Sequence, residues 1–390
     1  MKFRKAFFSA LLLAIAISSV YSADRFVPAK CGQKVNIDSL RKDVLKSILD
    51  SVGSAENLYV SKFMAVMERG VKPNIYGAFA PQYPLMFNDY VNPAGWTLPV
   101  SVKVKNYCDE GKPCRWRKVL LKAWIPGYTD TATVTKLVNP YEEVILSPQF
   151  IFDTKALARL TTPRNAKIEL RTYVLDADRE VLFDSQSDVI KIHPMDVFHN
   201  EDVPIENQSM WYGVWVTPNM DSISAIHEQI GKISTNGAVL GDVSNDVTET
   251  VKAVYDVLSK KHIKYINNAT YVNGGQKIKY PIQVLQKRQA YCLEGVFLFS
   301  SILESLGLQP LIVLVPNHAI LGWYTNTEKT QMDFLETTMA FMDGVDFETA
   351  NRAGIEVYNE NVKKRAFEKG DAQIIDIDQV RRNGIMPNDY

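Results

Sequence analysis

A long apolar segment near the end of the chain constrains the fold more than any other feature. From Cys292 onward the apolar residues recur at the spacing of a buried α-helix, at Val296, Phe297, Phe299, Ile302, Leu303 and Leu306. Gly307 follows, and glycine favours the left-handed conformation that often ends a helix. The pattern therefore predicts a buried helix that begins at or near Cys292 and is closed by Gly307.

Three short strands are predicted directly after this helix. They are expected at Leu311–Val315, Ala319–Tyr324 and Met332–Thr338. If the strands pair antiparallel, His318 and Glu336 lie side by side on neighbouring strands. The helix would then pack across the sheet with Cys292 facing both side chains.

Cys292, His318 and Glu336 are the residue types of a thiol nucleophile site. The N–H groups and the dipole at a helix N-terminus favour an anion, here the thiolate of Cys292. The His318 imidazole can hold the thiol proton, and the Glu336 carboxylate can orient the imidazole. Each residue alone also fits a structural role, such as a thiol packed as a small hydrophobe. The joint pattern favours a catalytic or formerly catalytic site.

At these residues the sequence resembles the transglutaminase-like superfamily of cysteine proteinase-type folds. The resemblance covers roughly Trp211 to Met386. The similar segments are Tyr291–Gly295, Asn317–Ala319 and Leu335–Thr338, with weaker similarity at Trp215–Asn219 and Val380–Ile385. The resemblance implies a papain-like α+β core, a Cys-His-Asp triad and acyl transfer through a thioester. Many bacterial members are thought to hydrolyse peptide or isopeptide bonds rather than crosslink proteins.

The resemblance also assigns roles to individual residues. Cys292 matches the nucleophile, and His318 matches the general base and acid. Glu336 matches the third position, where the usual residue is Asp, and its extra methylene changes the reach of the carboxylate. Asp333 is the alternative third member, although on a regular strand it would face the other way.

Further residues are candidates for binding the substrate. The backbone N–H of Cys292 is the first candidate for stabilising an oxyanion, and Gln286 or Gln289 could supply a second donor. The aromatic run that begins at Trp211 is expected to be a strand. Trp211 and Trp215 could line a substrate cleft, although an aromatic strand is more often core.

The first residues have the pattern of a secretory signal peptide. Lys2, Arg4 and Lys5 precede the apolar run Ala6–Val20, and small residues then allow cleavage before Ala23. An uncleaved anchor is the competing interpretation. We predict a signal peptide over residues 1–22 and an exported mature chain without a transmembrane segment, located in the periplasm, at the cell surface or outside the cell.

Two cysteines of the predicted mature chain fit a small disulfide loop. Cys108 and Cys114 bracket a turn-rich stretch of five residues, which suits a disulfide in an oxidising compartment. A metal site is the alternative, but no histidine lies near. Cys31 could pair with either cysteine, so the connectivity stays open.

The rest of the chain divides by the period of its apolar residues. Helical spacing predicts an N-terminal helical segment within residues 23–80, with helices from about Asp38 to Val71. Alternating apolar residues and regular turns predict an antiparallel, immunoglobulin-like β-sandwich over 81–200. Residues 201–390 have a mixed pattern and form the transglutaminase-like domain. The predicted fold class is therefore α+β.

Charge and composition limit the partners. The chain has 44 Lys and Arg residues against 44 Asp and Glu residues, and this balance argues against electrostatic binding of nucleic acid. His193 and His199 flank Pro194, but Asp196 is the only local carboxylate, and no calcium-site signature is evident. We expect neither a cofactor nor a metal requirement.

Three hypotheses for function remain open. The first is an exported thiol hydrolase or acyltransferase that acts on amide bonds of a protein or peptide substrate, with water or an amine resolving the thioester. The second is a catalytically silent scaffold that acts as a binding or assembly protein, contacting a partner through the β-sandwich. Redox sensing by Cys292 is weaker, because no resolving cysteine is nearby in sequence.

Overall fold

The computed structural model describes residues 58–61, 74–82, 101–107, 115–176, 179–199, 205–233, 247–267, 270–272 and 275–388. The predicted signal peptide, Cys31 and the predicted Cys108–Cys114 disulfide lie outside these residues. The chain forms two compact units. The first comprises Met1–Asn74, Thr97–Ile151 and Asn165–Lys191, and the second comprises Ile75–Trp96, Phe152–Arg164 and Ile192–Tyr390.

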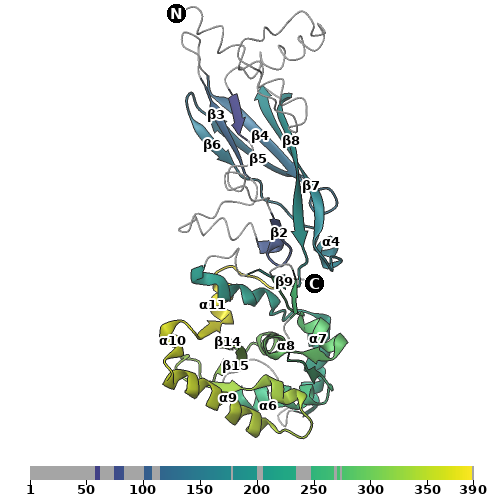
Figure 1. Cartoon of the computed structure of the whole chain (residues 1–390), viewed down its shortest axis with the longest axis vertical. Helices are drawn as coiled ribbons and strands as arrows, with labels where there is room; N and C mark the ends of the chain where they lie inside the picture. Colours follow the sequence, from purple (N-terminus) through teal and green to yellow (C-terminus); the bar gives the residue numbers. More distant parts are fainter. Residues whose placement is uncertain are drawn as a thin grey trace, which may run out of the picture. The chain divides into compact units, whose positions relative to one another are not determined.

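Antiparallel sheets make up the described part of the first unit. One has the order β1-β3-β6, with β1 at Leu58–Ser61, β3 at Val102–Asn106 and β6 at Glu143–Leu146. The other contains β8-β7-β4-β5 in that order, with β4 at Arg117–Trp124, β5 at Ala132–Val138, β7 at Arg164–Asp176 and β8 at Arg179–His193. Burial alternates along β3, as expected for a sheet with one packed face. Figure 1 shows the long strands β7 and β8 side by side.

The predicted N-terminal helical segment is wrong where the structure describes it. Residues 58–61 form β1, in which Val60 lies opposite Val104 of β3. Residues 74–76 form β2. Tyr59 and Val60 are aromatic and β-branched, and such residues form strands readily when a partner strand is present. Here the pairing with β3 overrides the helical spacing of the local sequence.

A four-stranded antiparallel sheet organises the second unit, with the order β16-β15-β14-β17. The strands are β14 at Pro310–Val315, β15 at His318–Tyr324, β16 at Met332–Leu335 and β17 at Gln373–Asp376. A two-residue turn joins β14 to β15, and Val315 pairs with His318 across it. Pro316 stands where type II turns favour proline, and Asn317 takes the positive φ of 61° that the next position requires. This turn fixes where His318 begins its strand.

The helix expected at Cys292 is present as α8, Cys292–Ser305. Gly307 has a φ of 77°, and the Leu308 N–H donates to the Leu303 carbonyl at 2.9 Å, which is the left-handed helix end that glycine favours. α8 packs along β14 and β15. Because nearly every residue of α8 is buried, its packing fixes the position of Cys292 relative to the sheet.

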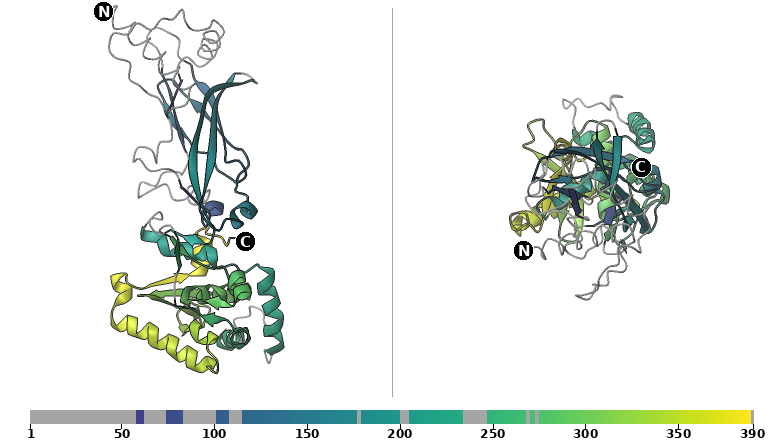
Figure 2. Two further views of the ribbon diagram at one scale, coloured as in Figure 1. Left: turned by 45° about the vertical axis from the view of Figure 1, so that its right-hand side comes forward. Right: turned by 90° about the horizontal axis from the view of Figure 1, so that it is seen from above.

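Other helices enclose this sheet (Figures 1 and 2). Helix α9, Phe347–Lys363, packs against β16, and α10, Ala366–Lys369, packs against α9. Their apolar residues form one core cluster with Leu311, Val313 and Ile320. The intervening residues of the same strands, such as Ile312 and Leu321, are also fully buried. The sheet is therefore covered on both faces.

The remaining elements are short. The helices are η3 at Ala80–Gln82, α4 at Thr154–Ala158, η5 at Ile205–Trp215, α5 at Asp221–Ile233, α6 at Val247–Ser259, α7 at Pro281–Lys287, η6 at Thr337–Phe341 and α11 at Ile377–Arg382. The strands are β9 at Val197–Phe198, β10 at Lys264–Tyr265, β11 at Thr270–Val272, β12 at Gly275–Lys277 and β13 at Gln289–Ala290. The fold is α+β. No helix within the described ranges is long and apolar enough to cross a membrane.

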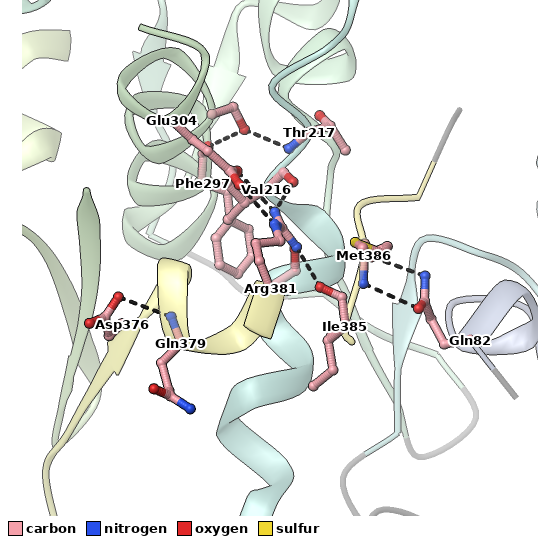
Figure 3. Close-up of polar contacts among 12 residues, drawn as sticks. Gln82, Val216, Thr217, Phe297, Glu304, Asp376, Gln379, Arg381, Ile385 and Met386 are labelled. Carbon is pink, nitrogen blue, oxygen red and sulfur yellow. Dashed lines mark hydrogen bonds and ion pairs between the residues drawn. The ribbon is translucent and has the colours of Figure 1, made fainter. Parts of the chain in front are cut away.

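Arg381 of α11 anchors the C-terminal half of α8 (Figure 3). Its guanidinium donates two hydrogen bonds to the Glu304 carboxylate, from Nε at 2.8 Å and from Nη2 at 2.9 Å. The other three donors reach the carbonyls of Gly213, Ile385 and Val216 at 3.0, 2.9 and 2.8 Å. All five N–H groups are therefore used. The two flanking segments singled out in the sequence, near Val216 and near Arg381, meet at this side chain.

Candidate functional site

Cys292, His318 and Glu336 come together at one end of the central sheet. Cys292 is the first residue of α8 and His318 the first residue of β15. Glu336 directly follows β16 and caps the N-terminus of η6. A thiol, an imidazole and a carboxylate therefore lie together, although they come from three elements that are separate in the sequence.

His318 interacts with both of the other side chains. Its Nε2 lies 2.6 Å from Glu336 Oε2, and the Cys292 side chain is near enough to raise the pKa of the same imidazole. An imidazole has two ring nitrogens. Because Glu336 occupies Nε2, Nδ1 is the nitrogen left for the thiol. The order thiol, imidazole, carboxylate is the arrangement that activates a nucleophile.

Glu336 reaches His318 from beyond the end of β16. The last pair of the β15–β16 register is Leu321 with Leu335, and Glu336 follows that pair. We expected Glu336 within a strand that ran to Thr338, but β16 ends at Leu335.

Glu336 uses both carboxylate oxygens. Oε2 contacts His318, whereas Oε1 accepts from the Thr338 N–H at 3.1 Å and from the Thr338 hydroxyl at 2.6 Å. Burial pushes the pKa of Glu336 upward, but the bonds to His318 and Thr338 outweigh it and hold the pKa below the usual glutamate value. The carboxylate is therefore charged and fixed in direction.

The imidazole is stabilised in its protonated form. The hydrogen bond with Cys292 and then the one with Glu336 raise the pKa of His318 to about 10, although burial acts in the opposite direction. In an ion-paired cysteine nucleophile, the imidazole that lies between the sulfur and the carboxylate carries a proton. Cys292 itself is a free thiol and half-buried, so a reagent can reach it.

A buried ion pair fixes the start of α8. The Glu294 side chain is 1% exposed and accepts from the Tyr291 N–H at 3.1 Å and the Lys279 N–H at 2.7 Å. Lys279 Nζ lies 2.9 Å from Glu294 Oε2. Burial raises the pKa of Glu294, and Lys279 opposes that rise. A carboxylate near the first turn of a helix satisfies backbone donors there, which holds Cys292 in place.

Asp333, the alternative third member, is directed elsewhere. It lies opposite Trp323 in the sheet. Its Oδ1 accepts from Asn351 Nδ2 at 2.8 Å and from the Phe334 N–H at 2.8 Å. Its carboxylate therefore connects β16 to α9, and Glu336 alone meets His318.

The candidate oxyanion donors Gln286 and Gln289 are both exposed. Gln286 belongs to α7, and Gln289 lies in β13 opposite Lys264. No hydrogen bond among the described residues links either amide to Cys292. Neither glutamine matches a motif firmly, so their role as oxyanion donors stays a prediction.

The prediction that Trp211 and Trp215 line a cleft is wrong. They belong to η5, a 3-10 helix, rather than to a strand. Trp215 is 0% exposed and stacks on Phe297 with ring centroids 6.4 Å apart. Trp211 is buried and packs edge-on against Phe79. A ring enclosed by core residues cannot contact a substrate, so both tryptophans stabilise the second unit.

Sequence reasoning missed Tyr265. Its place near Cys292 gives no local signal, because strands β11 and β12, helix α7 and strand β13 separate the two residues in the chain. In the structure β10, which contains Tyr265, pairs with β13, which leads into Cys292. The charges of Cys292 and Glu336 also act on the Tyr265 phenol.

The two histidines near Pro194 form a buried pair rather than part of a carboxylate-rich cluster. The rings of His193 and His199 lie 4.5 Å apart between centroids, and Asp196 forms an ion pair with Lys277 at 3.3 Å. Burial lowers the pKa of His199 to about 4. Within the described residues, no group of three or more His, Cys, Asp and Glu side chains could hold a metal ion.

No protein-family model matches this chain, and no curated protein matches it.

Proposed function

We propose that the chain is an exported thiol-dependent hydrolase or acyltransferase that acts on peptide-type amide bonds through a thioester at Cys292. The observation that carries this proposal is that His318 Nε2 lies 2.6 Å from Glu336 Oε2, while Cys292 raises the pKa of the same imidazole. Structural cysteines rarely have such neighbours, whereas reactive ones require them.

The reaction follows from these contacts. The Cys292 thiolate attacks the carbonyl carbon, and the π-electron pair moves onto the carbonyl oxygen. When the carbonyl re-forms, the C–N bond breaks and the amine leaves with the proton of the His318 imidazolium. Water or another amine then attacks the thioester, giving up its proton to His318 and releasing the acyl product from the sulfur. Glu336 keeps the imidazole oriented throughout.

Two further expectations belong to this proposal. The core is of the transglutaminase-like, papain-like type, which is supported by the helix-start cysteine, the hairpin-start histidine and the carboxylate beyond the next strand. The first unit is an immunoglobulin-like sandwich, which is supported by its antiparallel sheets. Export rests on the signal-peptide pattern of residues 1–22.

Alkylation by iodoacetamide tests the proposal without knowledge of the substrate. Labelling of Cys292, located by peptide mapping, should be faster than that of a free thiol at pH 7, because the thiolate is the reacting form. His318→Ala should slow it about tenfold or more. The matched control is His262→Asn, at an exposed site with a φ of 53° that asparagine tolerates. Slow labelling that is indifferent to His318 would contradict the proposal.

A second experiment separates hydrolysis from transfer. p-Nitrophenyl acetate should acetylate Cys292 with a burst of p-nitrophenolate. If hydroxylamine accelerates turnover and yields acetohydroxamate, amines compete with water for the thioester. If hydroxylamine has no effect, the chain is a hydrolase for this acyl group.

The alternative function, a silent scaffold that binds a partner, is favoured by exposed aromatic residues of the first unit. Trp116 is 61% exposed and Tyr141 is 69% exposed. The Asn106 side-chain amide donates to the carbonyl of Arg115, the residue before Trp116, and the Asn106 main-chain carbonyl accepts from the Tyr141 N–H. Exposed aromatic groups of this kind are typical of interaction surfaces. An unreactive Cys292 in the alkylation experiment would leave this function as the proposal.

A further inference from the structure

Tyr265 lies between the two elements that carry the nucleophile and the carboxylate. In the parallel pairing of β10 with β13, Tyr265 is opposite Ala290, two residues before Cys292. The Ile266 N–H donates to the Ala290 carbonyl at 2.9 Å, which secures this register. β10 also contacts η6, which Glu336 caps. The backbone therefore places β10, which contains Tyr265, next to the strand that leads into Cys292 and next to the helix that Glu336 caps.

The phenol of Tyr265 is a protonated donor that can change partners. Burial, followed by the negative charges of Cys292 and Glu336, raises the pKa of Tyr265 above its ordinary value, so the hydroxyl keeps its proton at neutral pH. Its described hydrogen bond goes to Asn267 Oδ1 at an exposed position and is long, at 3.4 Å. Bonds of this length are weak, and a stronger acceptor can replace Asn267.

The proposed reaction needs such a donor. Attack on a carbonyl creates an oxyanion, and such sites stabilise it with two or more aligned N–H or O–H groups. The Cys292 N–H is one, because it belongs to the first turn of α8, where N–H groups have no partner within the helix. Gln286 and Gln289 are exposed, and among the described residues no hydrogen bond links either of them to Cys292.

We propose that the Tyr265 hydroxyl is the side-chain hydrogen-bond donor to the oxyanion that forms when Cys292 attacks an acyl substrate. This inference rests on the function proposed above. In the addition step, the sulfur–carbon bond forms and the oxygen takes the electron pair of the carbonyl, while Tyr265 donates a hydrogen bond without transferring its proton. When the leaving group departs, the pair returns and the hydrogen bond weakens.

Two thiol reagents separate this role from others. p-Nitrophenyl acetate reacts with Cys292 through a tetrahedral oxyanion and releases p-nitrophenolate, whereas iodoacetamide reacts by direct displacement of iodide without an oxyanion. Tyr265→Phe should slow acetylation of Cys292 about 100-fold, the loss typical of one oxyanion donor. Its rate of alkylation by iodoacetamide should stay within twofold of the wild-type rate, which also shows that the variant is folded.

Tyr324→Phe is the matched control. Tyr324 ends β15 at the opposite end from His318, and its hydroxyl also makes a 3.4 Å hydrogen bond, to Asp376. Both reactions should be unchanged in this variant. The inference is overturned if Tyr265→Phe leaves acetylation unchanged, or if it slows both reactions equally, as expected for a residue that only orients His318. Wild-type protein that shows no burst and no selective alkylation would instead overturn the proposed function.

Discussion

At the scale of single residues, the site depends on the length of one side chain. Glu336 follows the last residue of β16, and its carboxylate reaches His318 Nε2 at 2.6 Å. The carboxylate is also held by Thr338. The glutamate therefore fits an intact site better than a decayed one.

Shortening this side chain should be as harmful as removing its charge. We expect Glu336→Asp and Glu336→Gln each to slow alkylation of Cys292 at pH 7 by about 10- to 100-fold, because a hydrogen bond to a charged group contributes about 1.5–3 kcal/mol. The shorter aspartate side chain does not reach the His318 imidazole, and the glutamine side chain lacks the negative charge that stabilises the protonated ring. Glu328→Asp, at an exposed turn, is the control. A Glu336→Asp variant with the wild-type rate would show that the reach from residue 336 to the His318 imidazole does not limit the reaction.

The raised pKa of His318 makes stability depend on pH. Its value of about 10 in the folded chain lies above the ordinary 6.5, because Cys292 and Glu336 bind the protonated ring. This stabilisation is complete below about pH 6.5 and is lost as the pH rises toward 10. We expect the free energy of unfolding in urea to fall more steeply between pH 7 and 10 in the wild type than in His318→Gln. Parallel curves for the two proteins would contradict the shift.

At the scale of elements, the sequence predicts those helices and strands whose formation depends on residues close together in the chain. The apolar run after Cys292 predicted α8, and the apolar runs that follow it predicted β14 and β15. Glu336 was assigned to the site, but its place beyond the end of β16 depends on the hydrogen bond of its N–H with Ala350 in α9. The strand β17 was not predicted, because residues 373–376 form a strand by pairing with β14, about 60 residues earlier in the chain.

The close packing of α9 on β16 gives a prediction at this scale. A Cβ on Gly354 would lie 2.7 Å from the Leu335 nitrogen and 2.8 Å from its Cα. Gly354→Ala should therefore displace α9 from β16, cost about 1–3 kcal/mol, and slow alkylation of Cys292, because Glu336 follows Leu335. Gly231→Ala in α5, where no atom lies within 4 Å, should stabilise by roughly 0.5–1 kcal/mol. Equal melting temperatures for the two variants would contradict the close contact.

At the scale of the whole molecule, the chain consists of two units, and all three triad residues belong to the second. The change from alternating to mixed apolar patterns predicted a β-rich part followed by a mixed part. It did not predict that both units draw on interleaved segments, because the pairing of distant segments leaves no periodic signal. The sequence predicts a strand at the aromatic run that begins at Trp211, but this run belongs to η5. Its tryptophan rings pack against Phe79 and Phe297, which are distant in the chain.

Within the second unit, Arg381 joins Gly213 and Val216 to Glu304 of α8 and to Ile385. Arg381→Met would leave Glu304, largely buried at 19% exposure, without its partner. Breaking a buried ion pair costs about 3–5 kcal/mol, which corresponds to a melting temperature lower by roughly 6–15 °C. The adjacent Arg382 is 64% exposed and pairs with Asp378 on the same helix, so Arg382→Met should cost under about 1 kcal/mol.

Because Arg381 acts through α8, the Arg381→Met variant should also label Cys292 more slowly well below its own melting temperature. Equal thermal shifts for the two arginine variants would show that this anchor does not hold the unit together.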